Sequence, residues 1–358
     1  MTLTARAGSL AGMGLANLID DLSTRYAYAG VALWPHGEDP VAVASGDVHG
    51  KIRVASVSKV VTAGVANAAG IGPLTDMSDA LGFRLRHPDH PGDVILAGEV
   101  AAHHAGLSDA GGYVPPEGAT LQQWMSRRES WGERPNSRFS YANLGYVLLA
   151  AAAERASGRR FGDLARDWLR QRGIAGGFNW WGVEDRTAIL PAVRPDGDGG
   201  WADQVDGEVA PLGLVGPGGE VVRPPKPGEA PWLWSPQGGL RTSLMGCLGL
   251  ARQVSTFDRM PLWSPILGPH DGPDDVYQSW GFGLQLLTDP PEYPVALAGH
   301  FGDAYGVRAG VWWDAKAKLA FAYILNGVAE RHGPDADSFT EDERAIFAAV
   351  ARERENAR

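Results

Sequence analysis

The N-terminal part of the chain predicts, in order, an amphipathic helix, a β-hairpin, a short strand and a second helix. Apolar residues that recur three and four positions apart indicate the first helix. Alternating apolar positions around a turn rich in Pro and Gly indicate the hairpin. The predicted segments are the helix around Leu15, Leu18, Ile19 and Leu22, the hairpin 29–44, the strand 52–55 and the helix 57–69.

The middle of the chain is mostly helical in its pattern, and the C-terminal part returns to strand signals. Residues 71–175 predict helices and few strands. Residues 185–235 are crowded with Gly and Pro, and their tryptophans predict a long irregular segment that packs on the body of the protein. The C-terminal signals are strands at 295–298, 307–313 and 319–325, a turn at 314–318, and a last helix opened by the capping box Thr340–Glu343.

This order predicts an α/β (α+β) architecture with one antiparallel sheet, flanked by helices and built from both chain ends. A mostly helical lobe is inserted between the two ends. We expect residues 1–70 plus 235–358 to form the α/β lobe and residues 71–234 to form the inserted helical lobe with long irregular loops. An active site is expected in the cleft between the lobes.

Composition and charge argue against several classes of function. The 358 residues are 44% hydrophobic and 21% charged, as in ordinary soluble globular proteins. The net charge of −10 argues against nucleic acid and against a membrane surface as partners. No transmembrane helix or secretory signal is indicated, so a cytoplasmic location is expected. The single cysteine, Cys247, allows no internal disulfide and is expected to be a small buried residue.

The strongest chemical signal is the S-x-x-K pattern formed by Ser56 and Lys59. On a helix, residues three apart share a face, which places the serine hydroxyl beside the lysine amine. A lysine whose pKa is lowered by burial can take the serine proton and so create a nucleophile. The chain has only five lysines, so this pattern is expected by chance roughly 0.2 times. The alternative is an ordinary Ser and Lys on a surface helix.

Two weaker signals lie further along the chain. Tyr141 and Asn143 stand just before a predicted helix. A nearby lysine ammonium favours the phenolate form of a tyrosine, and an asparagine amide can hold a lysine or a substrate amide. The alternative is an ordinary loop with Asn143 as a helix cap. In the segment Gly299–Asp303, His300 follows a predicted strand and the glycines permit a close approach of substrate backbone.

Taken in order, S-x-x-K, Y-x-N and H-x-G resemble the motifs of the serine β-lactamase and penicillin-binding protein superfamily. The similarity is greatest to its class C-like branch, which holds β-lactamase-related carboxylesterases, D-aminopeptidases and acyltransferases. It covers most of the chain, and the S-D-N triplet and the class A glutamate motif are missing, which argues against class A. The segments that carry the resemblance are 52–60, 103–107, 135–143 and 238–240.

The resemblance implies a role for each motif residue and no metal or cofactor. It also assigns His103 and His104, which could otherwise suggest a metal, to a structural loop. The implied roles are Ser56 as nucleophile, Lys59 and Tyr141 as general base and acid, Asn143 as the group that orients Lys59 and the acyl amide, His300 and Gly302 as members of the third motif, and the backbone N–H groups of Ser56 and Asp303 as oxyanion hole.

The third motif departs from the family pattern at Phe301, where β-lactamases and D-Ala carboxypeptidases usually carry Thr or Ser. A substrate carboxylate would lose a donor there and meet the negative Asp303, so an uncharged ester or a substrate with a free amine fits better. The alternative is that Asp303 pairs with Arg308. Phe301, Trp232 and Trp234 are candidates for an acyl pocket, with core packing as the alternative.

The sequence therefore predicts a serine hydrolase that forms an acyl-enzyme on Ser56 and acts on a small ester in the manner of a carboxylesterase. Three alternatives keep the chemistry: a D-amino-acid amidase or peptidase, a β-lactamase-type amide hydrolase, and an acyltransferase. A fourth is a catalytically silent binding protein of the same fold. The oligomeric state is left open.

Overall fold

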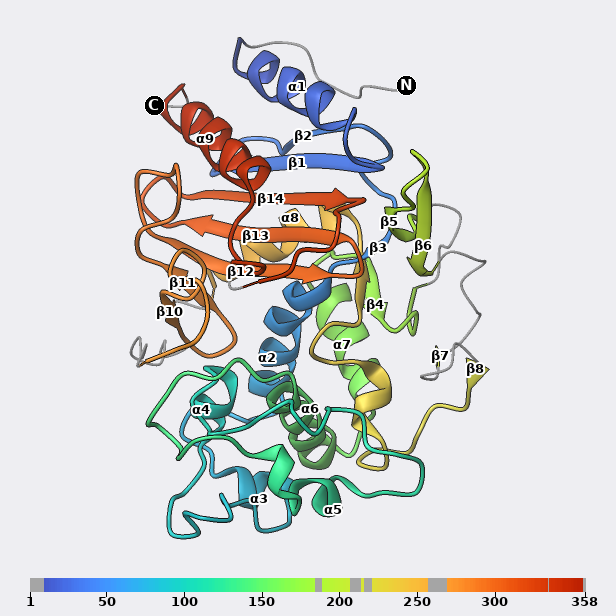
Figure 1. Ribbon diagram of the computed structural model, residues 1–358, viewed down its shortest axis with the longest axis vertical. Helices are drawn as coiled ribbons and strands as arrows, with labels where there is room; N and C mark the ends of the chain where they lie inside the picture. Colours follow the sequence, from blue (N-terminus) through green and yellow to red (C-terminus); the bar gives the residue numbers. More distant parts are fainter. Residues whose placement is uncertain are drawn as a thin grey trace.

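The computed structural model describes residues 10–183, 189–206, 214–215, 221–256, 269–333 and 335–356. Both ends of the chain meet in one antiparallel sheet of the order β10-β11-β12-β13-β14-β1-β2 (Figure 1). This confirms the predicted architecture. The strands are β1 (Tyr28–Pro35), β2 (Val41–Ala44), β10 (Ser279–Trp280), β11 (Gln285–Leu287), β12 (Leu297–Ala304), β13 (Val307–Asp314) and β14 (Leu319–Asn326).

Helices cover both faces of this sheet, and the strand period decides which side chain meets which helix. In β14, Phe321, Tyr323 and Leu325 pack in one core cluster with residues of α1 (Leu10–Leu22) and α9 (Glu341–Asn356). The alternate residues of β14 pack in a second cluster with α8 (Leu244–Val254). Because successive strand residues point to opposite faces, a fully apolar strand is needed between two helical layers.

The predicted helical middle of the chain is confirmed. The central helix α2 (Ser58–Ala68) runs from the sheet into this helical part and packs against α6 (Leu144–Ser157) and α7 (Phe161–Arg170) (Figure 1). None of the described helices is long and apolar enough to span a bilayer. The helices of this part are α3 (Met77–Leu81), α4 (Ala97–Ala101), α5 (Leu121–Met125), the short 3-10 turn η2 (Arg128–Ser130), α6 (Leu144–Ser157) and α7 (Phe161–Arg170). The division into two lobes at the predicted boundaries stays a prediction.

Two expectations need correction. The strand at 52–55 is only β3 (Ile52–Arg53), and it joins a separate small sheet with β9 (Leu240–Thr242) and β4 (Gly176–Phe178). The segment 185–235 is not wholly irregular, although residues 184–188, 207–213 and 216–220 lie outside the described residues. It contains the hairpin of β5 (Ala192–Pro195) and β6 (Trp201–Val205), the short pair β7 (Leu214–Val215) and β8 (Val221–Val222), and the 3-10 turn η3 (Pro231–Trp234).

Composition does not predict the β5–β6 hairpin, because the Asp- and Gly-rich segment that forms its turn is also typical of a loop. The Asp196 side chain accepts hydrogen bonds from the backbone N–H groups of Asp198 (2.8 Å) and Gly200 (2.9 Å). Gly197 and Gly199 adopt φ values of +89° and +87°, which only glycine adopts without strain. A cluster of Asp and Gly therefore forms a tight turn here rather than a linker.

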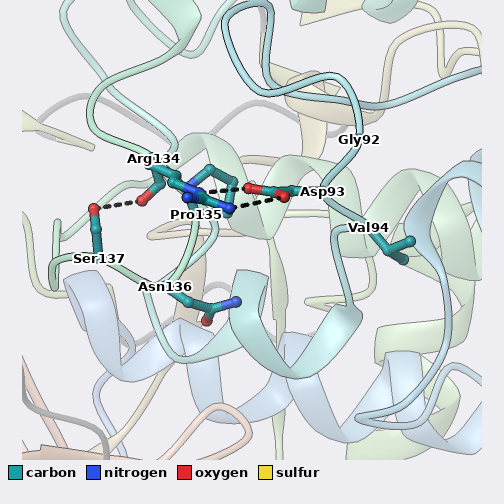
Figure 2. Close-up of a pocket in the computed structure, with 7 residues that line it drawn as sticks. All are labelled: Gly92, Asp93, Val94, Arg134, Pro135, Asn136 and Ser137. Atoms are coloured by element: carbon teal, nitrogen blue, oxygen red, sulfur yellow. Dashed lines mark hydrogen bonds and ion pairs between the residues drawn. The ribbon is translucent and has the colours of Figure 1, made fainter.

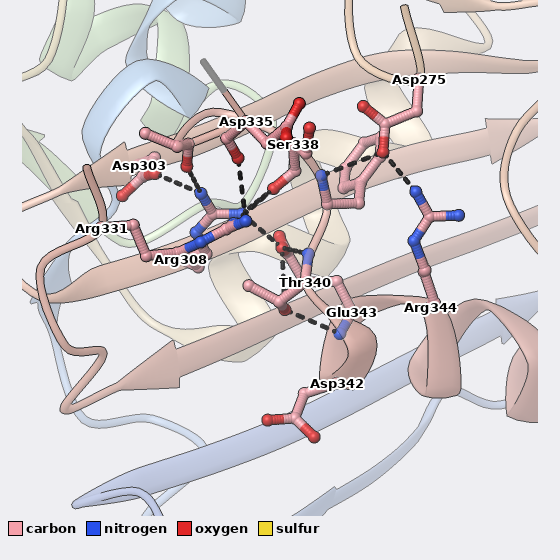
Figure 3. A network of polar contacts seen from close by, with 12 residues as sticks. Asp275, Asp303, Arg308, Arg331, Asp335, Ser338, Thr340, Asp342, Glu343 and Arg344 are labelled. Atoms are coloured by element: carbon pink, nitrogen blue, oxygen red, sulfur yellow. Dashed lines mark hydrogen bonds and ion pairs between the residues drawn. The ribbon is translucent and has the colours of Figure 1, made fainter. Parts of the chain in front are cut away.

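A buried ionic network joins α9 to the sheet (Figure 3). The Arg308 guanidinium on β13 donates to Glu343 Oε2 at 2.6 Å and to Asp303 Oδ2 at 2.6 Å. Glu343 also accepts from the Tyr323 hydroxyl at 2.8 Å and forms the predicted capping box with Thr340. Arg308 and Glu343 are 3% and 2% exposed, so each depends on the other for its charge.

Replacing Glu343 by Ala is expected to destabilise the protein by about 3–5 kcal/mol, because among the described residues it leaves the buried Arg308 cation with Asp303 as its one remaining carboxylate partner. Urea unfolding followed by circular dichroism measures the change. The matched control is Glu341→Ala on the exposed side of the same helical turn, which is expected to cost less than about 1 kcal/mol. Equal losses in both variants would contradict a stabilising role for the network.

Candidate active site

Ser56 lies at a strained junction between strand and helix. It is the middle residue of the 3-10 turn η1 (Ala55–Val57), which leads directly into α2. Ala55 adopts a φ of +47°, a conformation that costs free energy for any residue but glycine and that needs support from its surroundings. The buried Ser58 hydroxyl gives that support, since it donates to Ala55 O at 2.6 Å and accepts from Leu240 N at 2.9 Å.

The Lys59 side chain is fully buried and its amine meets three acceptors. Lys59 Nζ lies 2.9 Å from Ser56 Oγ, 2.8 Å from Asn143 Oδ1 and 2.9 Å from Gln237 O. Burial lowers the pKa of Lys59 to about 7, although the Asp109 carboxylate acts in the opposite direction. Near neutral pH a large share of the molecules therefore carries a neutral amine, whose lone pair can accept the serine proton.

Tyr141 completes the group around the serine. Its hydroxyl donates to Ser56 Oγ at 2.8 Å, and its ring stacks on His103 with the centroids 4.3 Å apart. Burial raises the pKa of Tyr141 well above its ordinary value. This corrects the expectation that the lysine favours a phenolate: the loss of hydration outweighs the nearby amine, so Tyr141 is a proton donor in the resting protein.

Asn143 does not cap α6 with its side chain, as the alternative interpretation proposed. Its amide is held instead by Asp109, a residue that the sequence motifs did not single out. The Asp109 carboxylate accepts from Asn143 Nδ2 at 2.9 Å and from the backbone N–H groups of Asn143 (2.7 Å) and Leu144 (3.0 Å). This fixes the amide orientation and turns Oδ1 toward Lys59. The only signal in the sequence was an acid shortly after the segment 103–107.

The open edge of β12 lies beside Ser56. The neighbouring strand β11 pairs with β12 only along Leu297–Gly299, and Phe301 N donates toward β11, to Gln285 Oε1 at 3.3 Å. Backbone N–H groups two residues apart point to the same side of a strand. The Asp303 N–H therefore points to this same edge, beyond the end of β11, where an oxyanion could be held.

Gly302 is the residue that lets this edge approach the serine. A Cβ at Gly302 would lie 2.5 Å from Val54 O and 3.3 Å from Ser56 N. The first of these distances is shorter than any real Cβ contact, so only glycine allows the two backbone segments to come so close. The predicted pair of donors, the N–H groups of Ser56 and Asp303, therefore lies on adjoining segments.

The other residues of the third motif are buried or turned away from Ser56. His300 is fully buried, and burial together with Lys59 lowers its pKa to about 3. The Phe301 ring packs 6.2 Å from the ring of Tyr141. The Asp303 carboxylate is held by Arg308 (Figure 3). The structure thus shows the alternative in which Asp303 pairs with Arg308.

The two pocket candidates from the 231–234 turn belong to the core. Trp234 is fully buried, and its Nε1 donates to Glu154 Oε1 at 3.0 Å. Trp232 is buried among the apolar residues of the helical part. The prediction that Trp234 lines an acyl pocket is wrong, because its ring fills the space above Gly162. Core packing was the stated alternative.

A hollow elsewhere on the surface has no part in this geometry. It is bordered by the ion pair of Arg134 and Asp93 and lies on the helical part of the molecule (Figure 2). None of the predicted site residues lines it. The hollow is lined by Gly92, Asp93, Val94, Arg134, Pro135, Asn136 and Ser137.

The beta-lactamase family model matches residues 4–344 of the sequence. This chain belongs to the beta-lactamase family. The family indicates an enzyme of the serine hydrolase type. A putative fimbrial assembly protein FimD, serogroup D, of Dichelobacter nodosus is 30% identical over 151 residues, which is 39% of this chain and 37% of that protein. The match thus spans little more than a third of that relative.

Solved structures of beta-lactamase-type fold are similar over nearly the whole chain. D-amino acid amidase from Ochrobactrum anthropi SV3, in complex with L-phenylalanine amide, superposes with a TM-score of 0.70 at 16% identity and covers 98% of this chain and 99% of its own. D-stereospecific amidohydrolase from Streptomyces gives 0.65 at 16%, with 96% and 99% covered. Penicillin-binding protein from Bacillus halodurans gives 0.64 at 14%, also with 96% and 99%. At these identities the similarity establishes the shared fold.

Substituting Gly302 by Ala tests the close approach of β12 to the serine. The added Cβ would push β12 away from Ser56 N and is expected to lower kcat/KM for a small ester about 100-fold, the effect of losing one oxyanion donor. Steady-state kinetics give the value. Gly92→Ala is the control, because a Cβ there meets nothing within 4 Å. Unchanged kinetics in Gly302→Ala would contradict the proposed proximity.

The pH profile tests the state of Lys59. Its amine can act as a base only when deprotonated, so kcat/KM is expected to rise about tenfold per pH unit in the acid range and to level off above about pH 7. Asp109→Asn removes a negative charge that raises the pKa of Lys59 and is expected to move the rising limb to lower pH. If kcat/KM rises only near pH 10, or if Asp109→Asn shifts the rise to higher pH, Lys59 is not the base.

Proposed function

We propose that this member of the beta-lactamase family is a serine hydrolase that forms an acyl-enzyme on Ser56 and acts on small carboxylic esters. The observation that carries the proposal is the position of Ser56 Oγ, which lies 2.9 Å from the amine of Lys59 and 2.8 Å from the hydroxyl of Tyr141. A serine between a base of lowered pKa and a protonated acid has both partners that acyl transfer needs.

In the proposed acylation, Ser56 Oγ bonds to the carbonyl carbon of the substrate and its proton passes to the neutral Lys59 amine. The bond to the leaving group breaks as Tyr141 donates its proton to the departing oxygen. The negative oxygen of the tetrahedral intermediate is held by the N–H groups of Ser56 and Asp303. The resulting Lys59 ammonium lies near the Tyr141 phenolate, since Nζ is 4.8 Å from the ring centroid.

Deacylation reverses these transfers with water as the nucleophile. The Tyr141 phenolate takes a proton from water, whose oxygen bonds to the acyl carbon. The bond to Ser56 Oγ breaks and the proton on Lys59 returns to the serine. The acid is released, and the three residues recover their starting protonation states, so each group acts once as donor and once as acceptor.

Amide hydrolysis is the second candidate. A departing amine must be protonated, and Tyr141 is held in its protonated form by burial. The D-amino acid amidases that share the fold support this candidate as well. Hydrolysis of a β-lactam is less favoured, since Phe301 stands where those enzymes carry a hydroxyl for the substrate carboxylate.

The proposal predicts that wild-type protein hydrolyses 4-nitrophenyl butyrate with a burst of nitrophenol, and that Ser56→Ala lowers the rate at least about 1,000-fold because the nucleophile is lost. Ser137→Ala, which changes an exposed serine, is the control and is expected to keep full activity. Mass spectrometry of acid-quenched protein should find the butyryl group on the peptide that contains Ser56. Equal activity of wild type and Ser56→Ala would reject the proposal.

The same proteins can decide between ester and amide. D- and L-phenylalanine 4-nitroanilide are compared with the ester under identical conditions, and an added alcohol tests acyl transfer to an acceptor other than water. A D-selective anilide rate comparable to the ester rate would move amide hydrolysis to the first place.

A further inference from the structure

Arg53 lies beside the candidate active site but takes no part in the proposed acylation. It lies on β3, three residues before Ser56. Its Nε donates to Gly238 O at 2.8 Å and its Nη2 donates to Ser235 Oγ at 3.2 Å. The guanidinium stacks over the ring of Tyr305, with 4.4 Å between Cζ and the ring centroid. These contacts hold the group in one place but include no negative charge.

The cation of Arg53 forms no ion pair with any residue that the structure describes. Arg241 stands directly opposite on β9, and the Asp206 carboxylate binds Arg241 Nη2 at 3.0 Å and Nε at 3.1 Å. Burial, followed by the repulsion from Arg241, lowers the pKa of Arg53 to about 10. An arginine so placed stays charged at neutral pH, and an anion beside it would relieve the loss of hydration.

The neighbours of Arg53 connect it with the site. Gly238, whose carbonyl it holds, directly follows Gln237, the residue whose carbonyl accepts from Lys59. Tyr305, on which it stacks, stands two residues after Asp303, at the turn between β12 and β13. Tyr305 is 37% exposed and Arg53 itself is partly exposed, so a ligand can reach this corner of the site.

Arg53 and Tyr141, the proposed proton donor to the leaving group, have different neighbours around Ser56. Tyr141, the proposed donor to the leaving group, lies among the rings of Tyr277, Trp280 and Phe301. Arg53 belongs to a different set. The direct contacts of its guanidinium among the described residues are Gly238, Ser235 and Tyr305, which lies beyond Asp303 at the end of β12, and they include none of these rings. Arg53 is therefore on the acyl side.

We propose that Arg53 binds a carboxylate carried by the acyl part of the substrate, such as a monoester or monoamide of a dicarboxylic acid. This inference rests on the proposed acyl-enzyme function of Ser56. The guanidinium has further N–H donors, since Nη1 makes no hydrogen bond with any described residue, and the exposed Tyr305 ring forms a wall beside it. The missing hydroxyl at Phe301 concerns the opposite part of the site and does not exclude such an acid.

The experiment compares substrates that differ only in charge. Mono-4-nitrophenyl adipate carries a carboxylate on the acyl chain, and its methyl ester is the neutral counterpart of the same length. 4-Butyryloxybenzoate carries the carboxylate on the leaving group. Wild type is expected to hydrolyse the adipate monoester with a kcat/KM roughly 10- to 100-fold above that of the methyl ester, the range for a charge-assisted hydrogen bond.

Variants then assign this preference to one residue. Arg53→Gln is expected to abolish the preference for the anionic acyl chain, with most of the change in KM, whereas Arg53→Lys retains part of it. Arg252→Gln is the matched control, because Arg252 stacks on Trp34 at 4.0 Å in the same manner and lies near the other end of the long strands. It is expected to change no ratio. High salt should weaken the preference in wild type and in Arg252→Gln, and should change little in Arg53→Gln, where no preference is left.

The ratio of the two rates distinguishes binding from a structural role of Arg53. If Arg53→Gln lowers both rates equally, the arginine only holds Gly238 and Ser235, and the proposal is wrong. A wild-type preference for 4-butyryloxybenzoate over the neutral ester would place the anion on the leaving-group side and also overturn it. If wild type hydrolyses the neutral ester in a reaction that depends on Ser56, but shows no preference for the adipate monoester, this inference is wrong and the proposed function stands. No turnover of any ester rejects the function itself.

Discussion

The buried amine of Lys59 is the interaction on which the rest of the site depends. An ammonium has three donors, and three acceptors from three parts of the chain surround Nζ: Ser56 Oγ, Asn143 Oδ1 and Gln237 O. When the amine loses a proton, two N–H groups remain for the asparagine and the backbone carbonyl, and the lone pair faces the serine. The geometry thus suits both protonation states, and burial brings their free energies close together near neutral pH.

This arrangement requires that the sheet, the helical part and the 235–238 segment all reach one point. The two fixed acceptors, Asn143 Oδ1 and Gln237 O, have their own supports: Asp109 orients the asparagine, and Arg53 holds the carbonyl of the next residue, Gly238. Ser56 is placed by the positive φ of Ala55 and by the Ser58 hydroxyl. Strain and buried polar groups at this junction are tolerated because well-packed layers on both sides of the sheet stabilise the fold.

The sequence was sufficient for the parts that local patterns determine. The S-x-x-K spacing predicts that Ser56 and Lys59 lie side by side where the turn η1 leads into α2, and the strand periods predict the antiparallel sheet from both chain ends. It was insufficient where tertiary packing decides. Asp109 acts through a contact 34 residues away in the chain, and no pattern near it reports that distance. Tyr141 was expected to be shifted toward phenolate, but its burial, which only the fold reveals, has the larger effect. Trp234 was a pocket candidate because composition cannot separate a core tryptophan from one that lines a site.

The charged side chains around the site differ in whether another described side chain neutralises them. Asp303 is neutralised by Arg308, and Arg241 by Asp206. Each pair keeps a charge next to the active site from acting on the substrate. Arg53 forms no ion pair with any described residue: it stands directly opposite Arg241, and the Asp206 carboxylate that pairs with Arg241 acts on Arg53 only from a longer distance. A cation that is kept charged, rigidly held by Gly238 and Ser235, and open on one side is unfavourable for the empty protein and favourable only when an anion is bound. The free energy that the unpaired Arg53 charge costs the substrate-free protein therefore provides selectivity. A neutral acyl chain leaves this charge uncompensated, whereas an acidic acyl chain compensates it.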